Sequence, residues 1–253
     1  MKVYFIGAGP GDPELLTLKA MKILKGAGYC IYAGSLINKE ILGYVPKDAK
    51  LFDSSKMSLD EVLDIMEKAH EKDIDVARLH SGDPSIYGAI QEQIESLDKK
   101  GIEYEIVPGV SSFQAAAASL NQELTLPGVS QTVILTRRAG KTPVPEREAL
   151  SILAKSRATM CIFLSIDQIE DIARELIPSY GKDCPVNVVY KVTWPDEKII
   201  KTTLSELSKE VKKERIDKTA LIIVGHVLSK EFNKSKLYDK NFSHSFRKND
   251  SKT

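Results

Sequence analysis

Three features of the sequence predict a protein of two α/β domains. Apolar, strand-like runs alternate with helical patterns through the first half, which is typical of a parallel sheet with crossover helices. A proline and a glycine in segment 124–128 separate this half from a second patterned half. There, Trp194-Pro-Asp-Glu197 lies between two strand-like runs and predicts a hairpin, so the second sheet should be mixed. We therefore expect an N-terminal domain over 1–124, a C-terminal domain over 129–231, and a loose Lys-, Asn- and Ser-rich tail over 232–253.

In the first half, short runs rich in apolar and β-branched residues predict strands at 2–7, 29–33, 50–52, 75–80 and 103–107. Helices are expected at 13–25, at 85–100 before Gly101, and at 112–119. Another long helix should begin at Ser58, because Ser58 and Glu61 are spaced to cap each other's amides.

The second half should begin with a strand at 131–136, followed by a polar loop and a helix at 146–155. Asp167 and Glu170 have a reciprocal capping spacing and predict the start of a further helix. The remaining strands are expected at 159–164, 186–191, 198–203 and 219–225.

The composition fits a soluble protein and argues against several kinds of partner. With 253 residues, 42% apolar content and a net charge of +1, the chain can form two cores and has no charge bias toward nucleic acid or membranes. The three widely spaced cysteines should be buried reduced thiols, and the four histidines show no metal-binding spacing, so no metal is expected. The first seven residues resemble a strand rather than a signal peptide or membrane span, which implies a cytoplasmic location.

A glycine-rich loop, Gly7-Ala-Gly-Pro-Gly-Asp-Pro13, directly follows the first expected strand. Its third glycine comes one residue too early for the dinucleotide pattern GxGxxG. Asp12 is placed to cap the helix that Pro13 begins, where its carboxylate would repel a pyrophosphate. A nicotinamide enzyme would also carry an acid after the second strand, where Ala33 and Gly34 stand. The loop therefore favours a ligand without phosphate, and a purely structural tight turn is the alternative.

Two more glycine-bearing segments follow strand ends in the same half. His80-Ser-Gly-Asp-Pro84 ends the fourth expected strand, and Val107-Pro-Gly-Val-Ser-Ser112 ends the fifth. The carboxyl ends of parallel strands form the ligand-binding edge of open α/β sheets, so all three segments should face one crevice. The alternative is that Asp83 and the two serines, Ser111 and Ser112, only cap helices.

Together, these ordered motifs resemble the tetrapyrrole (corrin/porphyrin) methyltransferase family over about residues 2–230. The resemblance implies a methyltransferase with its active-site cleft between two α/β domains, and a homodimer. It implies S-adenosylmethionine as methyl donor, S-adenosylhomocysteine as product, and a tetrapyrrole as the small-molecule substrate. The donor-binding residues that it implies are Pro10, Ser81, Gly82, Asp83, Ile86, Ser111, Ser112, Leu164, Val192, Ala220 and Leu221.

Two stretches resemble one branch of that family, the precorrin-4 C11-methyltransferases of cobalamin biosynthesis: Tyr32-Ala-Gly-Ser-Leu36 and the segment 136–146. Ala33 stands where the uroporphyrinogen-methylating branch commonly has an acid, which argues against uroporphyrinogen as substrate. The resemblance thus implies methylation of precorrin-4 or cobalt-precorrin-4 at C-11. Methylation of a precorrin at C-17 or C-20 is the alternative within this class, and a nicotinamide-dependent oxidoreductase is the alternative outside it.

The tetrapyrrole substrate carries many carboxylates, so cations should line the surface that binds it. The candidates are Arg137, Arg138 and Lys141, in the polar loop after the first strand of the second half, with Lys191 a weaker one. The alternative is an ordinary solvated basic loop. No base–nucleophile pair is visible and none is required, because the pyrrole nitrogens make the ring carbons electron-rich; no catalytic residue is therefore assigned.

Overall fold

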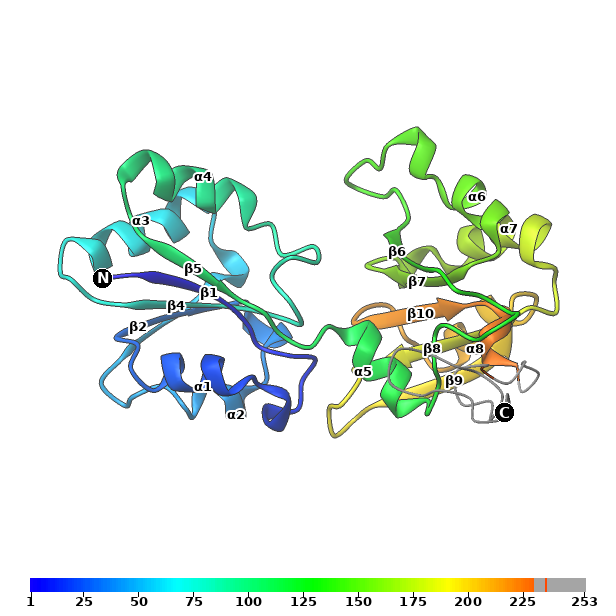
Figure 1. Ribbon diagram of the computed structural model, residues 1–253, viewed down its shortest axis with the longest axis horizontal. Coiled ribbons are helices and arrows are strands. Elements are labelled where there is room, and N and C mark those ends of the chain that lie inside the picture. The colour runs from blue at the N-terminus through cyan, green and yellow to red at the C-terminus, as the bar shows by residue number, and fades with distance from the viewer. Residues whose placement is uncertain (230–234, 236–253) are drawn as a thin grey trace, which may run out of the picture. The chain divides into compact units, whose positions relative to one another are not determined.

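The computed structural model describes residues 1–229 and 235, which form two compact units with one five-stranded sheet each (Figure 1). The first unit comprises Met1–Ser119 and Lys191–Lys198, and the second comprises Leu120–Tyr190 and the described residues from Ile199 to Ser229. The predicted α/β class with two sheets is confirmed. The tail predicted at 232–253 lies outside the described residues, apart from Ser235.

The sheet of the first unit is wholly parallel, with strand order β3-β2-β4-β1-β5. All five predicted strands of this half form, within two residues of the expected bounds. Because the strands are parallel, their carboxyl ends lie at one edge of the sheet. The strands are β1 (Val3–Gly7), β2 (Tyr29–Tyr32), β3 (Lys50–Asp53), β4 (Val76–His80) and β5 (Tyr104–Val107).

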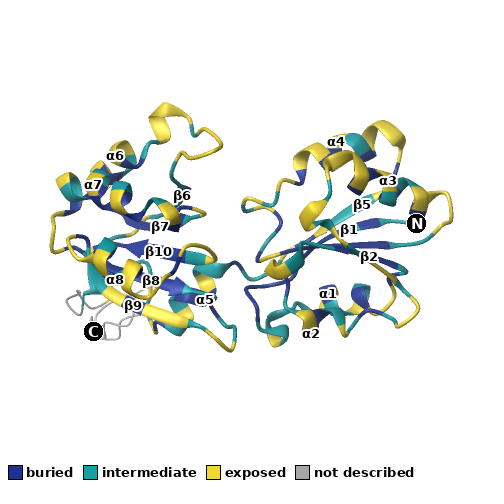
Figure 2. Ribbon diagram, turned by 180° about the vertical axis from the view of Figure 1, so that it is seen from behind, coloured by how far each residue is buried: buried dark blue, intermediate teal, exposed yellow. Residues whose placement is uncertain are grey.

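Helices cover both faces of this sheet (Figure 1). Side chains of β4 alternate between the two layers: Leu79 packs into one buried cluster, while Val76 packs into the other. Figure 2 shows the result, with buried strands under helices whose outer faces are exposed. One face carries α1 (Leu18–Leu24) and α2 (Lys39–Leu42), the other carries α3 (Leu59–His70) and α4 (Gln91–Lys100), and α5 (Ser112–Ser119) follows β5.

Two helices of the first unit begin later than the sequence predicts. Pro13–Leu15 forms only a 3-10 turn, and α1 starts at Leu18 after Thr17 caps it. The helix expected from residue 85 starts at Gln91, because Tyr87 and Ala89 have φ values of 56° and 49°, which an α-helix does not allow. The reciprocal cap predicted at the start of α3 is confirmed, and the short α2 was not predicted.

The sheet of the second unit has strand order β6-β7-β10-β8-β9 and is mixed, as predicted. β6 is parallel to β7, whereas β10 is antiparallel to both β7 and β8. Residues of α6, α7 and α8 share one buried cluster with β7, β8 and β10. The elements are β6 (Val133–Arg137), α6 (Leu150–Leu153), β7 (Thr159–Phe163), α7 (Ile169–Tyr180), β8 (Pro185–Tyr190), β9 (Lys198–Thr203), α8 (Leu207–Lys213) and β10 (Ala220–Val224).

Three expectations for the second half need correction. The helix expected at 146–155 is a four-residue α6 between two 3-10 turns. The reciprocal cap at Asp167 and Glu170 does not form, because α7 begins only at Ile169 and no side chain caps it. Segment 124–128 packs within the second unit, where the Leu124 carbonyl accepts a hydrogen bond from Thr159 Oγ1 at 2.8 Å. The division therefore falls at residue 119 rather than at the proline and glycine.

All three cysteines are buried free thiols, as predicted. Burial raises the pKa of Cys30 and Cys161 to about 12 and that of Cys184 to about 11, so these thiols stay protonated. Among the described residues, no helix has the length and apolar character needed to cross a membrane.

Candidate functional site at the strand ends

The three glycine-bearing segments of the first unit meet at the carboxyl ends of β1, β4 and β5. Gly9 N–H donates to the Gly82 carbonyl at 3.2 Å, and Gly82 N–H donates to the Gly9 carbonyl at 2.8 Å. Gly109 N–H donates to Asp83 Oδ2 at 2.8 Å. The structure therefore brings together the three segments that the sequence predicts to share one edge.

Two of the glycines are required by this close approach of backbones. A Cβ atom on Gly7 would lie 2.5 Å from Gly109 Cα, and one on Gly109 would lie 2.3 Å from the Gly82 carbonyl oxygen. Gly82 is different, because it has a φ of +67° and its nearest neighbour would be Ser111 Cα, at an ordinary 3.5 Å. Because Gly82 has no side chain, the space next to Ser111 is not filled by the protein, although a Cβ atom would fit there.

The glycine loop does not offer the free amides that a phosphate needs. The N–H groups of Ala8, Gly9 and Asp12 donate to His80, Gly82 and Thr193 at 2.8, 3.2 and 2.9 Å. Pro10 has no N–H. Among the amides of this loop, only that of Gly11 has no hydrogen-bond partner in the described chain. Asp12 Oδ1 accepts from Glu14 N–H at 2.8 Å, as the predicted cap. Phosphate sites need several free N–H groups and no carboxylate, so this loop fits a ligand without phosphate.

Hydroxyl groups are the polar atoms that this edge leaves available. Ser81 is exposed, Ser112 is half-buried and Ser111 is 4% exposed, and none of their hydroxyls has a hydrogen-bond partner among the described residues. By contrast, both carboxylate oxygens of Asp83 are engaged, Oδ1 by Ser85 and Oδ2 by Gly109. Burial alone would raise the pKa of Asp83, but these hydrogen bonds outweigh it and lower the pKa. Asp83 therefore links two of the loops through Gly109 and also accepts hydrogen bonds from Ser85.

In the second unit, four strand ends share one edge of the mixed sheet. Arg137 ends β6 opposite Phe163 of β7, and Tyr190 ends β8 opposite Ala220, where β10 begins. Because β10 runs antiparallel to β7, Ala220 lies at the same edge as Leu164, the residue after β7. Leu164 is 70% exposed. It also has a φ of 52°, a strained conformation of the kind found at functional sites.

The other predicted donor contacts differ in what they expose. Leu221 and Val192 are 3% and 5% exposed, so these two can offer a ligand little beyond their backbone groups. Ile86 is half-buried in the irregular segment before α4, and Pro10 is buried in the glycine loop. Val192 is counted with the first unit, together with the rest of Lys191–Lys198.

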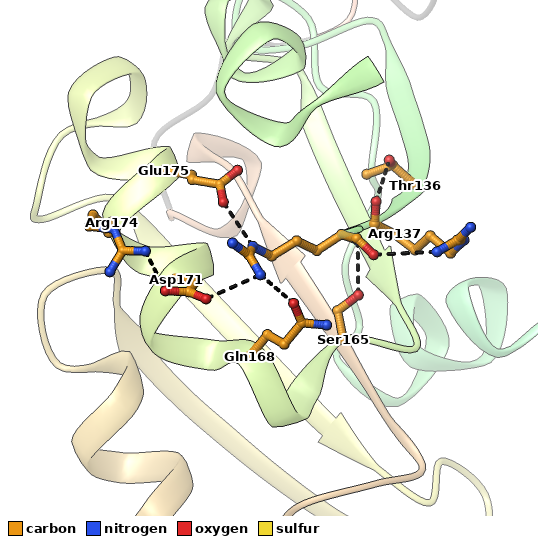
Figure 3. Close-up of polar contacts among 8 residues, drawn as sticks. Thr136, Arg137, Ser165, Gln168, Asp171, Arg174 and Glu175 are labelled. Carbon is orange, nitrogen blue, oxygen red and sulfur yellow. Dashed lines mark hydrogen bonds and ion pairs between the residues drawn. The ribbon is translucent and has the colours of Figure 1, made fainter. Parts of the chain in front are cut away.

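Arg138 is held by carboxylates inside the second unit. Its partners Glu175, Asp171 and Gln168 are labelled in Figure 3. Its guanidinium lies 2.8 Å from Glu175 Oε1 and 3.1 Å from Asp171 Oδ2, and it also donates to Gln168. Its backbone N–H donates to Ser165 Oγ at 2.9 Å. With only 21% of its side chain exposed, Arg138 attaches the end of β6 to α7. The sequence suggested a substrate contact here, but this carboxylate partnership was not visible in it.

Arg137 and Lys141 are placed differently from Arg138. Arg137 donates to the carbonyls of Thr142 and Pro143 at 3.2 and 2.7 Å, so its side chain braces the loop that follows it. Lys141 is exposed and has no ion pair or hydrogen bond with any residue of the described chain. Of the three predicted cations, Lys141 is therefore the one with neither an ion pair nor a hydrogen bond in the described chain.

His80 is a buried histidine beside the loops. It is 7% exposed, and its Nε2 has no hydrogen-bond partner among the described residues. Burial, and then the nearby Arg78 charge, lower the pKa of His80 to about 3, so the ring is neutral at physiological pH. In the part of the chain that the structure describes, no three His, Cys, Asp or Glu residues are grouped to bind a metal ion.

Sequence reasoning missed the residues that hold the glycine loop from outside. Trp194 Nε1 donates to the Pro10 carbonyl at 2.9 Å, Thr193 Oγ1 accepts from Asp12 N–H, and Asn38 Nδ2 donates to the Gly11 carbonyl at 2.9 Å. Trp194 was interpreted only as part of a hairpin turn. Its being the only tryptophan of the chain was the one available signal.

These features are those of a two-unit α/β protein whose first sheet brings three glycine-bearing segments together at its strand ends. The chain belongs to the tetrapyrrole (corrin/porphyrin) methylases, whose family pattern matches residues 2–208. It is therefore a methyltransferase.

Individual relatives narrow the comparison. A Methanocaldococcus jannaschii protein named cobalt-precorrin-4 C(11)-methyltransferase is 55% identical over 99% of this chain and 98% of its own length. The X-ray structure of a cobalt precorrin-4 methyltransferase, described as a cobalamin biosynthetic enzyme, matches 90% of this chain and 96% of its own with a TM-score of 0.88 and 44% identity. A Thermus thermophilus uroporphyrin-III C-methyltransferase complexed with S-adenosylhomocysteine matches 90% of this chain and 99% of its own, with a TM-score of 0.77 and 28% identity.

Proposed function

We propose that this enzyme methylates C-11 of precorrin-4 or cobalt-precorrin-4 in cobalamin biosynthesis. The observation that carries the proposal is the 55% identity, over nearly the full length of both chains, to a cobalt-precorrin-4 C(11)-methyltransferase. Ala33, where uroporphyrinogen-methylating relatives commonly carry an acid, supports the same choice of substrate.

The proposed methyl donor is S-adenosylmethionine, bound at the strand ends of the first unit. The donor has hydroxyl, amino and carboxylate groups but no phosphate, which suits a glycine loop whose amides are already paired. The hydroxyls of Ser81, Ser111 and Ser112 are available to hydrogen-bond it. Gly82 would let it approach the backbone. The proposed set of contacts is completed by Pro10, Asp83, Ile86, Leu164, Val192, Ala220 and Leu221.

The residues of this site need only bind and orient the two reactants. The donor supplies a methyl group on a positively charged sulfur, which is a good leaving group. The protein therefore has to bring that methyl within near-attack distance of the ring carbon. Holding two reactants in the right geometry can by itself accelerate a reaction greatly. In the first unit, backbone hydrogen bonds between Gly9 and Gly82, and the bond from Gly109 N–H to the Asp83 carboxylate, fix the loops that would do this.

Lys141 and Arg137 are the proposed contacts for the ring carboxylates. Lys141 presents an unpaired charge, and Arg137 holds the loop on which Lys141 lies. Arg138 contributes indirectly, because it fixes the start of the same loop on α7. Cationic groups of this kind attract the substrate and fix its orientation.

The family resemblance also leads us to propose a cytoplasmic homodimer. Size-exclusion chromatography with light scattering tests the dimer, and a mass of one chain at micromolar concentration would reject it. Cell fractionation tests the location.

Product analysis tests the reaction itself. The protein is incubated with precorrin-4 or cobalt-precorrin-4 and isotopically labelled S-adenosylmethionine, and NMR locates the added methyl group. A label on C-11 is expected. A label on C-17 or C-20 would replace the proposal by methylation at that position. Calorimetry with S-adenosylhomocysteine and NADH side by side tests the donor, and binding of NADH alone would indicate an oxidoreductase.

A further inference from the structure

The segment Lys191–Lys198, which connects β8 and β9, packs against the glycine loop of the first unit. Trp194 is its central contact, because the indole N–H donates to the Pro10 carbonyl at 2.9 Å. Thr193 adds a second hydrogen bond, through Oγ1, from Asp12 N–H at 2.9 Å. The segment therefore touches the loop at two of its residues.

Gly11 explains why the indole can come so close. A Cβ atom on Gly11 would lie 2.2 Å from both Cδ1 and Nε1 of Trp194, a distance that real atoms do not tolerate. Gly11 does not have a positive φ, so its role is to leave room for the ring. Gly11 is the third glycine of the loop, which comes too early for a dinucleotide pattern. The indole of Trp194 packs directly against it.

The segment is itself braced, so it can fix the loop. Glu197 Oε2 accepts hydrogen bonds from Thr193 N–H and from Ser119 Oγ. Lys191 Nζ pairs with Asp196 and lies 5.7 Å from the centre of the Trp194 ring. Residues before and after Trp194 are therefore linked across the turn, which fixes the turn that carries the indole.

Three consecutive residues of the loop are then fixed from other segments: the Pro10 carbonyl by Trp194, the Gly11 carbonyl by Asn38 and the Asp12 amide by Thr193. Pro10 is one of the proposed donor contacts, and so is Val192, two residues before Trp194. The segment Lys191–Lys198 therefore contains one proposed donor contact, Val192, and fixes the backbone of a second, Pro10.

We propose that Trp194 is the positioning residue that holds the glycine loop in the conformation that binds S-adenosylmethionine. This inference rests on the proposed function. Trp194 acts through Pro10 and Gly11. The consequence is that donor affinity depends on the indole N–H, whereas affinity for the ring does not.

Substitution of Trp194 by Phe removes the N–H and keeps an aromatic ring against Gly11. We expect Trp194→Phe to raise the Kd for S-adenosylhomocysteine by about tenfold, the order that one lost hydrogen bond produces. The KM for the tetrapyrrole and the melting temperature should change little. Pro195→Ala is the matched control, because Pro195 is exposed in the same turn and makes no hydrogen bond to the loop, and it should keep the wild-type Kd.

The close contact with Gly11 gives a second, independent test. Gly11→Ala should weaken S-adenosylhomocysteine binding strongly in the wild type, because the new methyl group collides with the indole. In a Trp194→Ala background the same change should have little further effect, because the ring is absent. Equal effects in the two backgrounds would contradict the contact as the cause.

Trp194 also provides a direct spectroscopic signal, because it is the chain's only tryptophan. Its fluorescence should shift as S-adenosylhomocysteine is added, with the same Kd as calorimetry gives. A Trp194→Phe variant with an unchanged Kd, or a loss of melting temperature alone, would overturn the inference while leaving the proposed function intact. Failure of the wild-type protein to bind S-adenosylhomocysteine would instead overturn the proposed function, and this inference with it.

Discussion

Arg138 Nε donates a hydrogen bond to Glu175 Oε1 at 2.8 Å, and this pair joins the end of β6 to α7. Asp171 lies on the same guanidinium, 3.1 Å away, so the Arg138 charge is balanced within the second unit (Figure 3). The sequence grouped Arg138 with Arg137 and Lys141 as substrate contacts. The structure gives the three cations different environments: a half-buried anchor, a brace for the loop and an exposed charge.

Removing the anchor should destabilise the protein. Arg138→Ala removes the ion-pair partner of Glu175 and leaves Asp171 with only the exposed Arg174, so we expect a loss of about 1–2 kcal/mol in the free energy of unfolding. Urea denaturation followed by circular dichroism measures it. Arg174→Ala is the matched control, because Arg174 also pairs with Asp171 but its side chain is 71% exposed, where ion pairs contribute little. Equal losses in both variants would show that Arg138 is not an anchor.

Lys141→Ala should act on substrate binding alone. Loss of one unpaired charge facing a polycarboxylate should raise the KM for the tetrapyrrole by about threefold to tenfold, and added salt should narrow the difference. The Kd for S-adenosylhomocysteine should stay the same. Lys182→Ala removes an exposed charge at the opposite edge of the same sheet, before β8 begins, and serves as the control. A tetrapyrrole KM equal to that of the control would remove Lys141 from the substrate site.

His80 should make the protein less stable in mild acid. Burial lowers the pKa of His80 to about 3, below its ordinary value of 6.5, so between these pH values the unfolded chain binds a proton that the folded chain does not. The contribution of His80 to the free energy of unfolding is therefore present above pH 6.5 and is lost as the pH falls. The loss is about 2 kcal/mol between pH 7.5 and pH 5. Urea titrations at both values should show a smaller decline in His80→Gln.

The exposed His70 gives the control for that comparison, because His70→Gln also removes one imidazole but from the surface of α3. It should keep the wild-type decline. The same decline in His80→Gln as in the wild type would mean that another group causes the loss of stability.

The strands and the site edge were predictable because their signals are local. The strands that precede the glycine-bearing segments are short runs rich in apolar residues, and the carboxyl-end rule then places these segments together. The segment before α4 failed for the opposite reason. Ile86 and Ile90 have helical spacing, but Tyr87 and Ala89 adopt positive φ, a conformation that neither residue type favours on its own. Only contacts with the rest of the fold can impose it.

Contacts between distant segments were beyond the sequence for the same reason. Gly11 and Trp194 are close only in the folded chain, and no local pattern links a glycine in a loop to an indole in a remote turn. Arg138 and Glu175 are a similar case, because charge alone does not distinguish a cation that binds substrate from one that is paired in the fold. The sequence therefore predicted which strand ends come together, and the structure adds the contacts between distant segments that support them.

Gly82 and Gly101 together allow a test of the proposed donor site that separates backbone strain from ligand contact. Both have a left-handed φ, +67° and +65°, so alanine should cost about 1 kcal/mol of stability at either position. Neither new methyl group would collide with the protein, because its nearest neighbour at Gly82 is 3.5 Å away and nothing lies within 4 Å at Gly101. Gly82→Ala should therefore weaken S-adenosylhomocysteine binding by at least about tenfold in calorimetry, because the methyl group takes space that the donor would use. Gly101→Ala, with the same strain at the end of α4, should bind like the wild type. Equal affinities in the two variants would place the donor away from Gly82.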